Sequence, residues 1–281
     1  MSRIRSILTS HPIQQFRRDR RFYLRYDSFW FVVCALACAV MLGTHFEPLI
    51  GRPSLYWLLV FPPVLYGLIV AHLCMHNATH GNFPRAINRL VGELCGLAVI
   101  VRYASWDIVH MRHHKYSDDR EKDPHPNFAS FGKTLIHTII NVELQLQHQY
   151  LETWGDTPEN RAFEKFRARV SYGTNIVLGA AWMLLLGPWF FWLVFIPANV
   201  LAAIFVIHFN WSTHNGMRGD DFRPVNLNSG YFWLGNKLFA GIYMHANHHQ
   251  RPHLFNPLHW DARRFGPAEE PVDRPEIPSH A

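Results

Sequence analysis

The sequence VSYGTNIVLGAAWMLLLGPWFFWLVFIPANVLAAIFVIHFNWSTHNGM, residues 170–217, runs for 48 residues without Asp, Glu, Lys or Arg. A helix needs about 20 apolar residues to cross the hydrocarbon core of a bilayer, so this stretch is long enough for two crossings. Gly187-Pro188 and Pro197 interrupt it. We expect a short turn near Pro197 to separate a span over residues 174–193 from a span over residues 198–211.

Two further stretches lack charged residues in the same way. Residues 28–46 predict a first span, and the uncharged residues 53–84 predict a second over residues 55–75. The first span begins nearly 30 residues into the chain and no small-residue cleavage site follows it, which argues against a cleaved signal peptide. We therefore predict an all-α integral membrane protein with four transmembrane helices.

Basic residues predict the orientation of these spans. Seven Arg precede the first span, the loop between the first two spans contains only Arg52, and the turn near Pro197 contains none, so 26 of the 27 Lys and Arg fall on one side. The positive-inside tendency makes that side cytoplasmic, with both termini there and a bacterial inner membrane as the expected location. The net charge of +6 then reflects topology and contact with anionic lipids rather than nucleic-acid binding.

The chain divides accordingly into three parts. Residues 1–27 form a basic cytoplasmic N-terminal segment, residues 28–255 a membrane domain, and residues 256–281 a C-terminal tail. Within the membrane domain, residues 91–101 are too short to span and are expected to lie in the membrane interface or to re-enter partway. Apolar and polar residues are mixed over residues 131–170 at a spacing that suits surface helices, which could face the membrane.

Histidines gather where the predicted spans end. The pattern H-x-x-H-H occurs twice, as HMRHH at residues 110–114 and as HANHH at residues 245–249. Histidines at positions i, i+3 and i+4 lie on one face of a helix, where three imidazoles converge. With 19 histidines in 281 residues, one such pattern arises by chance about 0.1 times per chain, so two copies indicate a metal-binding role.

Further histidines stand at the ends of the second and fourth predicted spans, and on the predicted topology all these clusters reach the cytoplasmic side. We therefore expect a cytoplasmic helical cap that carries them. The candidate metal ligands are His76, His80, His110, His113, His114, His214, His245, His248 and His249. Asn210 shares a helix face with His214.

Nine imidazoles exceed what one metal ion needs. A single zinc site takes three or four protein ligands, so nine suggest two metals. Imidazole suits iron, copper, nickel and zinc alike, and the residue type alone does not choose among them. The sequence has no Glu-x-x-His pair of the kind that builds soluble di-iron bundles. Its four cysteines lack the C-x-x-C spacing of an iron–sulfur centre and do not suggest a disulfide framework.

At this point the motifs resemble those of the membrane fatty acid desaturase superfamily. The resemblance rests on HNATHG from residue 76, HMRHH from residue 110 with KDP from residue 122, NWSTH from residue 210, and HANHH from residue 245 with PH at residues 252–253. It includes the order and spacing of these boxes relative to four spans and covers about residues 55–255. Membrane alkane hydroxylases, fatty acid hydroxylases and carotenoid ketolases or hydroxylases share variants of the same boxes.

The resemblance implies two iron ions held by the nine candidate histidines, with O2 as co-substrate. In acyl desaturases the amide that matches Asn210 touches the centre through water, so Asn210 is expected beside the metals. The implied reaction uses O2 and two electrons to abstract hydrogen from an alkyl chain; loss of a second hydrogen gives a double bond, whereas oxygen rebound gives an alcohol. Desaturation of a fatty acyl chain is the leading expectation.

Two rival functions remain at this point. One is a hydroxylase or ketolase acting on an alkane, a fatty acid, or a carotenoid or other terpenoid. The other is a non-catalytic membrane metal-binding protein or transporter, although the uncharged spans argue against transport.

The expected partners follow from the same resemblance. They are the membrane, a lipid or acyl substrate, and a separate electron donor of the ferredoxin, rubredoxin or cytochrome b5 type, because the sequence contains no fused donor domain and no rubredoxin-type Cys pairs. Arg and Lys beside the histidine boxes would suit an acidic donor.

Other polar residues have weaker assignments. Asp107 and Asp123 are expected to accept N–H bonds from ligating imidazoles, with ordinary loop caps as the alternative. His253 is expected beside the metals, at the polar end of a substrate, or simply in a loop. His72 and His208 are expected to be hydrogen-bonded polar residues rather than ligands. The remaining candidates for solvated or structural roles are His11, His125, His137, His148, His259 and His280.

Overall fold

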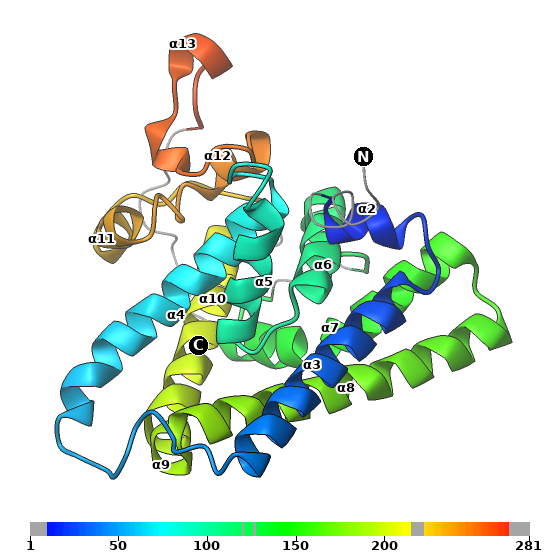
Figure 1. Cartoon of the computed structure of the whole chain (residues 1–281). Coiled ribbons are helices and arrows are strands. Elements are labelled where there is room, and N and C mark those ends of the chain that lie inside the picture. The colour runs from blue at the N-terminus through cyan, green and yellow to red at the C-terminus, as the bar shows by residue number, and fades with distance from the viewer. Residues whose placement is uncertain (1–9, 120, 126–127, 215–221, 270–281) are drawn as a thin grey trace.

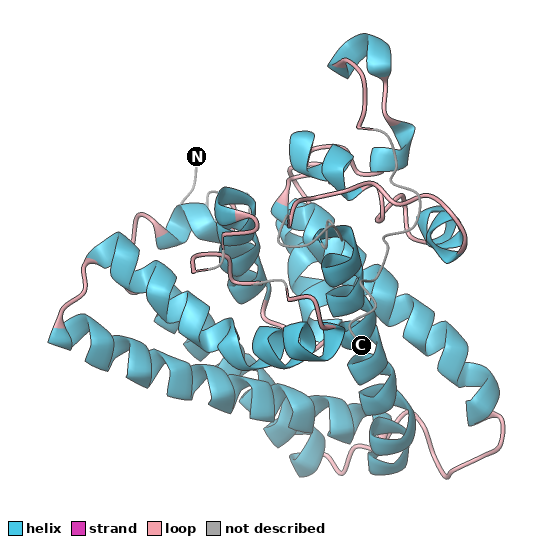
Figure 2. Ribbon diagram, turned by 180° about the vertical axis from the view of Figure 1, so that it is seen from behind, coloured by secondary structure: helices cyan, strands magenta, loops and turns pink. Residues whose placement is uncertain are grey.

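The computed structural model describes residues 10–119, 121–125, 128–214 and 222–269. Within these ranges the regular structure is helical, apart from one isolated β-bridge between Asn226 and Met244 (Figure 2). The elements are α2 Pro12–Phe16, α3 Phe22–Gly43, α4 Trp57–Thr79, α5 Asn88–Ala98, α6 Tyr103–Tyr116, α7 Phe131–Trp154, α8 Pro158–Leu186, α9 Pro188–Phe190, the π-helix η1 Phe191–Phe195, α10 Ile196–His214, α11 Tyr231–Leu238, α12 His245–Gln250, the 3-10 helix η2 Pro257–His259, and α13 Ala262–Phe265. The all-α prediction is confirmed for the described residues. Residues 1–9 of the predicted N-terminal segment and 270–281 of the predicted tail lie outside them.

Three helices are long and apolar enough to cross a membrane. They are α3, α4 and the run Pro188–His214, which comprises α9, η1 and α10. The pair α5 and α6 passes the same test together but is bent by 105°, as a broken span or a re-entrant segment would be. The described residues therefore contain three candidate spans, or four if the bent pair counts as one.

The predicted turn near Pro197 was wrong. The chain breaks instead at Gly187, whose φ of 88° favours glycine, and Pro188 starts the next helix. A Cβ on Gly187 would lie 2.8 Å from the carbonyl oxygen of Ile50, so the turn packs tightly against the loop between α3 and α4. Pro197 is tolerated inside the helical run because it is the second residue of α10, just after the π-helix, which already departs from the regular i→i−4 hydrogen bonds.

Two helix pairs organise the molecule. α3 lies along α8, and α4 lies along α10 with α5 on its other side (Figure 1). Ala198 and Ala202 of α10 are fully buried one turn apart, and small residues at this spacing let two helix backbones approach closely. Gly92 serves the same purpose in α5, because a Cβ there would lie 2.5 Å from the ring of Tyr103 at the start of α6.

A buried network of charged side chains ties α3, α7 and α8 to the start of α6. Arg102 pairs with Asp27 (2.7 Å) and with Glu143 (2.7 Å), and Arg167 pairs with Glu143 (2.9 Å) and with Glu164 (2.9 Å). Asp27 and Arg167 have no solvent exposure. Charges withdrawn from water need such partners. The network fixes the beginning of α6, the helix that carries three of the candidate ligands.

Candidate metal centre

Four helices deliver the candidate ligands to one region. His76 lies in the last turn of α4, His80 follows as its C-cap, and α10 ends at His214. The second half of α6 carries residues 110–114, and the six-residue α12 carries residues 245–249. Figure 1 shows α12 beside the ends of α4 and α6, above α10.

Two buried asparagines fix the short α12. Asn226 Nδ2 donates to Asn247 Oδ1 (2.9 Å), and the backbone N–H of Asn247 donates to Asn226 Oδ1 (3.2 Å). Asn247 is the spacer between the ligand positions and is completely buried. Neither residue stands at a defining position of a pattern that pointed to a site in the sequence. A six-residue helix is too short to be stable alone, so these bonds determine where its imidazoles point.

The structure brings all nine candidate histidines together. Eight form two groups of four, and within each group the potential ligand atoms lie within 4.8 Å of one another. One group is His76, His80, His110 and His248, and the other is His113, His214, His245 and His249. Each H-x-x-H-H pattern is divided between the two groups. The two copies of the pattern are therefore parts of one double site and not separate sites.

The ring nitrogens Nε2 of these histidines face inward. Seven Nε2–Nε2 distances among the described residues lie between 2.8 and 3.3 Å. His114 belongs to neither group of four. Its Nε2 lies 3.0 Å from that of His110 and 3.3 Å from that of His248, and its ring stacks on His249 with centroids 4.4 Å apart. It therefore stands between the two groups.

Carboxylates set the tautomers of two ligands in the second group. His113 Nδ1 lies 2.9 Å from Asp123 Oδ1, and His214 Nδ1 lies 3.2 Å from Asp118. A neutral imidazole that donates from Nδ1 carries a lone pair on Nε2. The Nε2 atoms of His113 and His214 are 3.2 Å apart, so two lone pairs face each other. A proton or a metal ion between the rings removes this repulsion, and the donor set fits a metal.

The site keeps its imidazoles in the form that binds metals. Burial, reinforced by neighbouring imidazoles, lowers the pKa values of His245 and His248 well below the ordinary value. Burial raises the pKa of Asp123, but the attraction and hydrogen bonds of His113 and His125 together outweigh burial, and the pKa falls to about 2. At neutral pH the imidazoles of His245 and His248 are neutral and the Asp123 carboxylate is ionised. This is the protonation state that metal ligation requires.

The group spacings also fit metal–imidazole bond lengths. Such bonds are about 2.0–2.1 Å long, so nitrogens bound to one ion lie roughly 3–4 Å apart. The seven Nε2–Nε2 distances fall close to this range and each group lies within 4.8 Å. The described residues can therefore hold two metal ions with nitrogen ligands.

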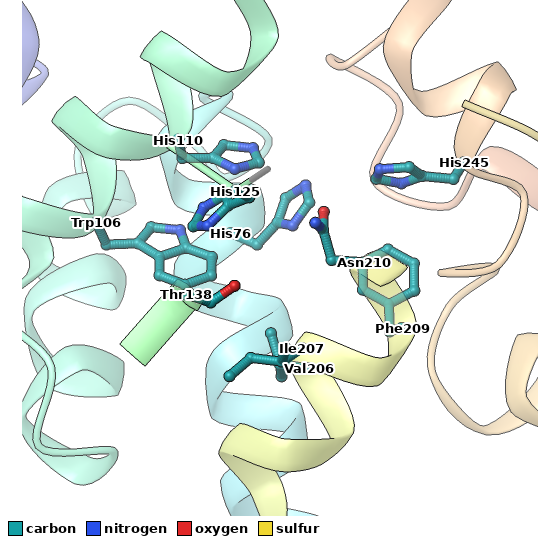
Figure 3. Close-up of a pocket in the computed structure, with 10 residues that line it drawn as sticks. All are labelled: His76, Trp106, His110, His125, Thr138, Val206, Ile207, Phe209, Asn210 and His245. Carbon is teal, nitrogen blue, oxygen red and sulfur yellow. The ribbon is translucent and has the colours of Figure 1, made fainter. Parts of the chain in front are cut away.

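The residues that were expected to lie beside the metals, without binding them, differ from one another in position. Asp123 lies behind His113 as described. Figure 3 shows Asn210 with its amide directed toward His76, within a small cavity also lined by His245. His253 Nδ1 bonds the backbone carbonyl of His80 (2.8 Å), so it holds the end of α4.

Asp107 has another partner than the one predicted. Its carboxylate accepts the backbone N–H of Ile13 (2.7 Å) and anchors α2 to α6. Asp107 lies three residues before His110, where α6 packs against α2.

Two residues beside the ligands were not singled out by sequence reasoning. Asp118 is one. The sequence feature that could have identified it is the acidic pair Asp118-Asp119, which follows HMRHH by a few residues. His125, expected to be solvated or structural, is partly buried with its ring 5.5 Å from that of His113. Burial, with His113 beside it, lowers the pKa of His125 to about 4. His72, by contrast, is a hydrogen-bonded polar residue as expected, with Nδ1 3.0 Å from the carbonyl oxygen of Leu68.

A small cavity lies against the candidate ligands and adjoins a larger one. The smaller, of about 60 Å³, touches His76, His110 and His245 (Figure 3). The larger, of about 350 Å³, extends away from the ligands between α4, α6, α7, α8 and α10. Five wall residues belong to both: Trp106, His125, Thr138, Val206 and Ile207. Most of this wall is apolar, so the arrangement can hold a hydrocarbon chain next to a pair of metals.

Comparison with curated proteins finds similar chains among desaturases. Over 142 residues the chain is 28% identical to an sn-1 oleoyl-lipid 12-desaturase of Anabaena variabilis, which covers 47% of this chain and 38% of that protein. Over 130 residues it is 30% identical to an omega-6 fatty acid desaturase, endoplasmic reticulum isozyme 2, of Glycine max, covering 44% and 32%. The match therefore spans only about a third of each relative's length. No solved structure matches the chain.

The family comparison covers much more of the molecule. A family model described as fatty acid desaturase matches residues 54–268, a range that begins before α4 and ends after α13. It includes all nine candidate ligands and both carboxylates behind them. Since it covers well over half of the 281 residues, the chain belongs to the fatty acid desaturase family.

Proposed function

We propose that this protein is an O2-dependent membrane oxidoreductase that uses two iron ions to introduce a double bond into a fatty acyl chain. The observation that carries the proposal is the convergence of two four-histidine groups on the end of a largely apolar cavity. Family membership supports it, as do the names of the two relatives, one a desaturase of an oleoyl lipid and the other of fatty acids.

The nine histidines would hold the iron. One ion falls to the group of His76 and the other to the group of His113, with His114 available between them. Bound iron would supply the activation of O2 and the removal of hydrogen from the chain. The protein's own residues keep His245 and His248 neutral by burying them, fix the tautomers of His113 and His214 through Asp123 and Asp118, and surround the reacting carbons with apolar side chains.

The expected orientation agrees with the positions of the loops. The loop between α3 and α4 meets the turn at Gly187, where the backbone N–H of Leu49 donates to the carbonyl of Leu185 (2.9 Å). This end of the spans is remote from the candidate ligands, and Arg52 is the one Lys or Arg in its loop. We therefore assign the histidine-bearing helical cap and both termini to the cytoplasm, at the inner membrane of a bacterium.

Electrons would arrive from a separate acidic protein of the ferredoxin, rubredoxin or cytochrome b5 type. His114 and His249 are only partly buried, and the exposed Lys115 and Arg251 lie one and two residues beyond them. A positive surface beside partly exposed ligands suits the docking of an acidic donor.

Lipid analysis tests the proposed reaction. The protein is expressed with a ferredoxin and its reductase in a host whose acyl chains are fully defined, and the chains are analysed by mass spectrometry. The expected result is a new double bond that requires both O2 and His248. The His248→Ala variant serves as the control because it removes a ligand of the first group. Hydroxylated or ketone products without new double bonds would refute desaturation, and a protein that binds iron but yields no O2-dependent product would be a metal-binding protein only.

A further inference from the structure

The larger cavity has an apolar opening on the side of the molecule. Three of its wall residues are also strongly exposed, namely Ile139 (63%), Ile140 (70%) and Tyr172 (55%). Ile139 and Ile140 belong to α7, and Tyr172 belongs to α8. A side chain that lines a cavity and is more than half exposed stands at its mouth. The cavity therefore opens between α7 and α8, with α10 behind.

This opening lies at the level of the membrane. Ala203, Val206 and Ile207, which form the wall contributed by α10, belong to a candidate span. The start of α7 crosses the last turns of that span, since the ring of Phe131 lies 5.3 Å from that of His208 and Trp211 Nε1 donates to the carbonyl of Phe128 (2.9 Å). The mouth is thus near the cytoplasmic end of the hydrocarbon region.

The surroundings of the mouth match lipid rather than water. Four exposed apolar residues of α7 form one stripe at helical spacing: Ile136, Ile139, Ile140 and Leu144. Ile176 on α8 (71%) and Val200 on α10 (52%) extend the exposed apolar surface. In a protein with membrane spans such a surface is covered by acyl chains.

The inside of the cavity suits a chain without charge. Arg102 and Glu143 line it, but their charges are paired with each other at 2.7 Å. Toward the ligands the cavity narrows to the space of about 60 Å³ beside His76 and His110. A chain that enters between α7 and α8 therefore has its free end directed past Thr138 and Trp106 toward the metals.

From these contacts we propose that the substrate is the acyl chain of a bilayer lipid, which enters sideways from the membrane through the mouth formed by Ile139, Ile140 and Tyr172. The inference rests on the proposed function and extends it, because it names a membrane-resident lipid rather than a water-soluble thioester as the carrier of the chain.

Photolabelling tests the entrance without requiring turnover. The iron-loaded protein is placed in phosphatidylcholine vesicles that contain a phosphatidylcholine with a diazirine in one acyl chain. After illumination, labelled peptides are identified by mass spectrometry. Label is expected on the cavity wall, at Thr138 and Val206, in addition to the outer lipid-facing surface.

Matched variants separate the mouth from the rest of the surface. Ile140→Asp puts a carboxylate in the mouth and is expected to reduce wall labelling by about tenfold or more, because an apolar chain must pass a charge. Ile136→Asp changes an equally apolar residue of the same stripe that does not line the cavity and is expected to leave wall labelling unchanged. Ala203→Phe fills the cavity and should also abolish wall labelling, whereas Val200→Phe, on the outside of α10, should not.

The outcomes distinguish this inference from the proposed function. Equal wall labelling in Ile140→Asp and Ile136→Asp, with iron content preserved, would overturn the lateral entrance. So would wall labelling by a diazirine acyl thioester in lipid-free detergent that is unaffected by both variants. Wall labelling that follows the expected pattern in a protein that forms no double bonds would leave the entrance intact and refute desaturation instead.

Discussion

His214 Nδ1 lies 3.2 Å from both carboxylate oxygens of Asp118, although 96 residues separate them in the chain. The contact joins the end of α10 to the loop after α6 and fixes which nitrogen of His214 faces the other ligands. Asp123 does the same for His113 from the same loop. One loop therefore controls two ligands of a single group.

Removing the Asp118 carboxylate is expected to weaken metal binding. Loss of the carboxylate behind a ligating histidine typically lowers metal affinity by about 10- to 100-fold, because the ring loses its preferred tautomer and orientation. We expect this loss for Asp118→Ala, with partial recovery in Asp118→Asn, which keeps an acceptor oxygen. Competition with a graded series of chelators measures it. Glu121→Gln, an exposed carboxylate in the same loop, is the control. Unchanged affinity in Asp118→Ala would contradict the role of this contact.

Replacing a single ligand, in either group, is expected to remove one metal ion and all activity. His248→Ala removes a ligand of the first group and His113→Ala a ligand of the second. Iron analysis of each purified variant should give about one ion per chain instead of two, since a four-ligand site loses much of its affinity with one donor gone. His148→Ala, an exposed histidine of α7, should retain both ions. Full turnover by either ligand variant would refute the ligand assignment.

Metal removal is expected to destabilise the protein. A ligand that binds only the folded state stabilises it by about 2.7 kcal/mol at a concentration 100 times its Kd. Chelation should therefore lower the melting temperature in detergent, and added Fe2+ should restore it. The shift should be smaller in His113→Ala, which has lost part of one site. An identical melting temperature with and without chelator would show that the histidine cluster is stable without a cation.

The buried charge network should be sensitive to loss of a single member. Arg167 is completely buried and contacts Glu143 and Glu164 at 2.9 Å. Arg167→Met leaves these carboxylates without their shared cation, and breaking a buried ion pair costs about 3–5 kcal/mol. Denaturant titration in detergent measures the change. The exposed pair Asp156–Arg161 supplies the control, and Asp156→Asn should change stability little. Equal effects of the two variants would contradict the importance of the network.

Reversing charge beside the ligands should impair electron delivery without affecting iron. Lys115→Glu and Arg251→Glu each place a negative charge on the surface expected to bind an acidic donor. We expect the KM for the donor to rise severalfold and more steeply at low salt, since surface electrostatics are screened by ions. Arg161→Glu, on a remote exposed site, is the control. If the KM for the donor did not depend on salt in any of the three variants, the donor would bind at another surface.

The clustering of the candidate ligands could be predicted from sequence because much of it depends on local spacing. Histidines at i, i+3 and i+4 share a helix face whatever the rest of the chain does, and this holds for His110 and His245 alike. Their division into two groups could not be predicted, because it depends on how α6 and α12 meet. The same is true of Asp118, whose partner lies on another helix.

The span boundaries were harder to predict. The sequence signals a break at both Gly187-Pro188 and Pro197, and the predicted turn was placed at Pro197, but the break occurs at Gly187, where only glycine fits against Ile50. That fit is a tertiary contact and cannot be read from the local sequence. Nor does the spacing of Asp27, Arg102 and Arg167 show that these charges neutralise one another, because each sits on a different helix.

The order in which the partners of Asp27 occur along the chain has a consequence for protein synthesis and membrane insertion. Asp27 emerges from the ribosome 75 residues before its partner Arg102 and 144 residues before Ser171, which also bonds it. At about 5–20 residues per second, the first of these partners follows by several seconds. During that interval the first apolar helix carries an unpaired acidic residue at its start. We expect its final placement to wait for the later helices, so that membrane integration of the first span is completed only when α8 has been synthesised.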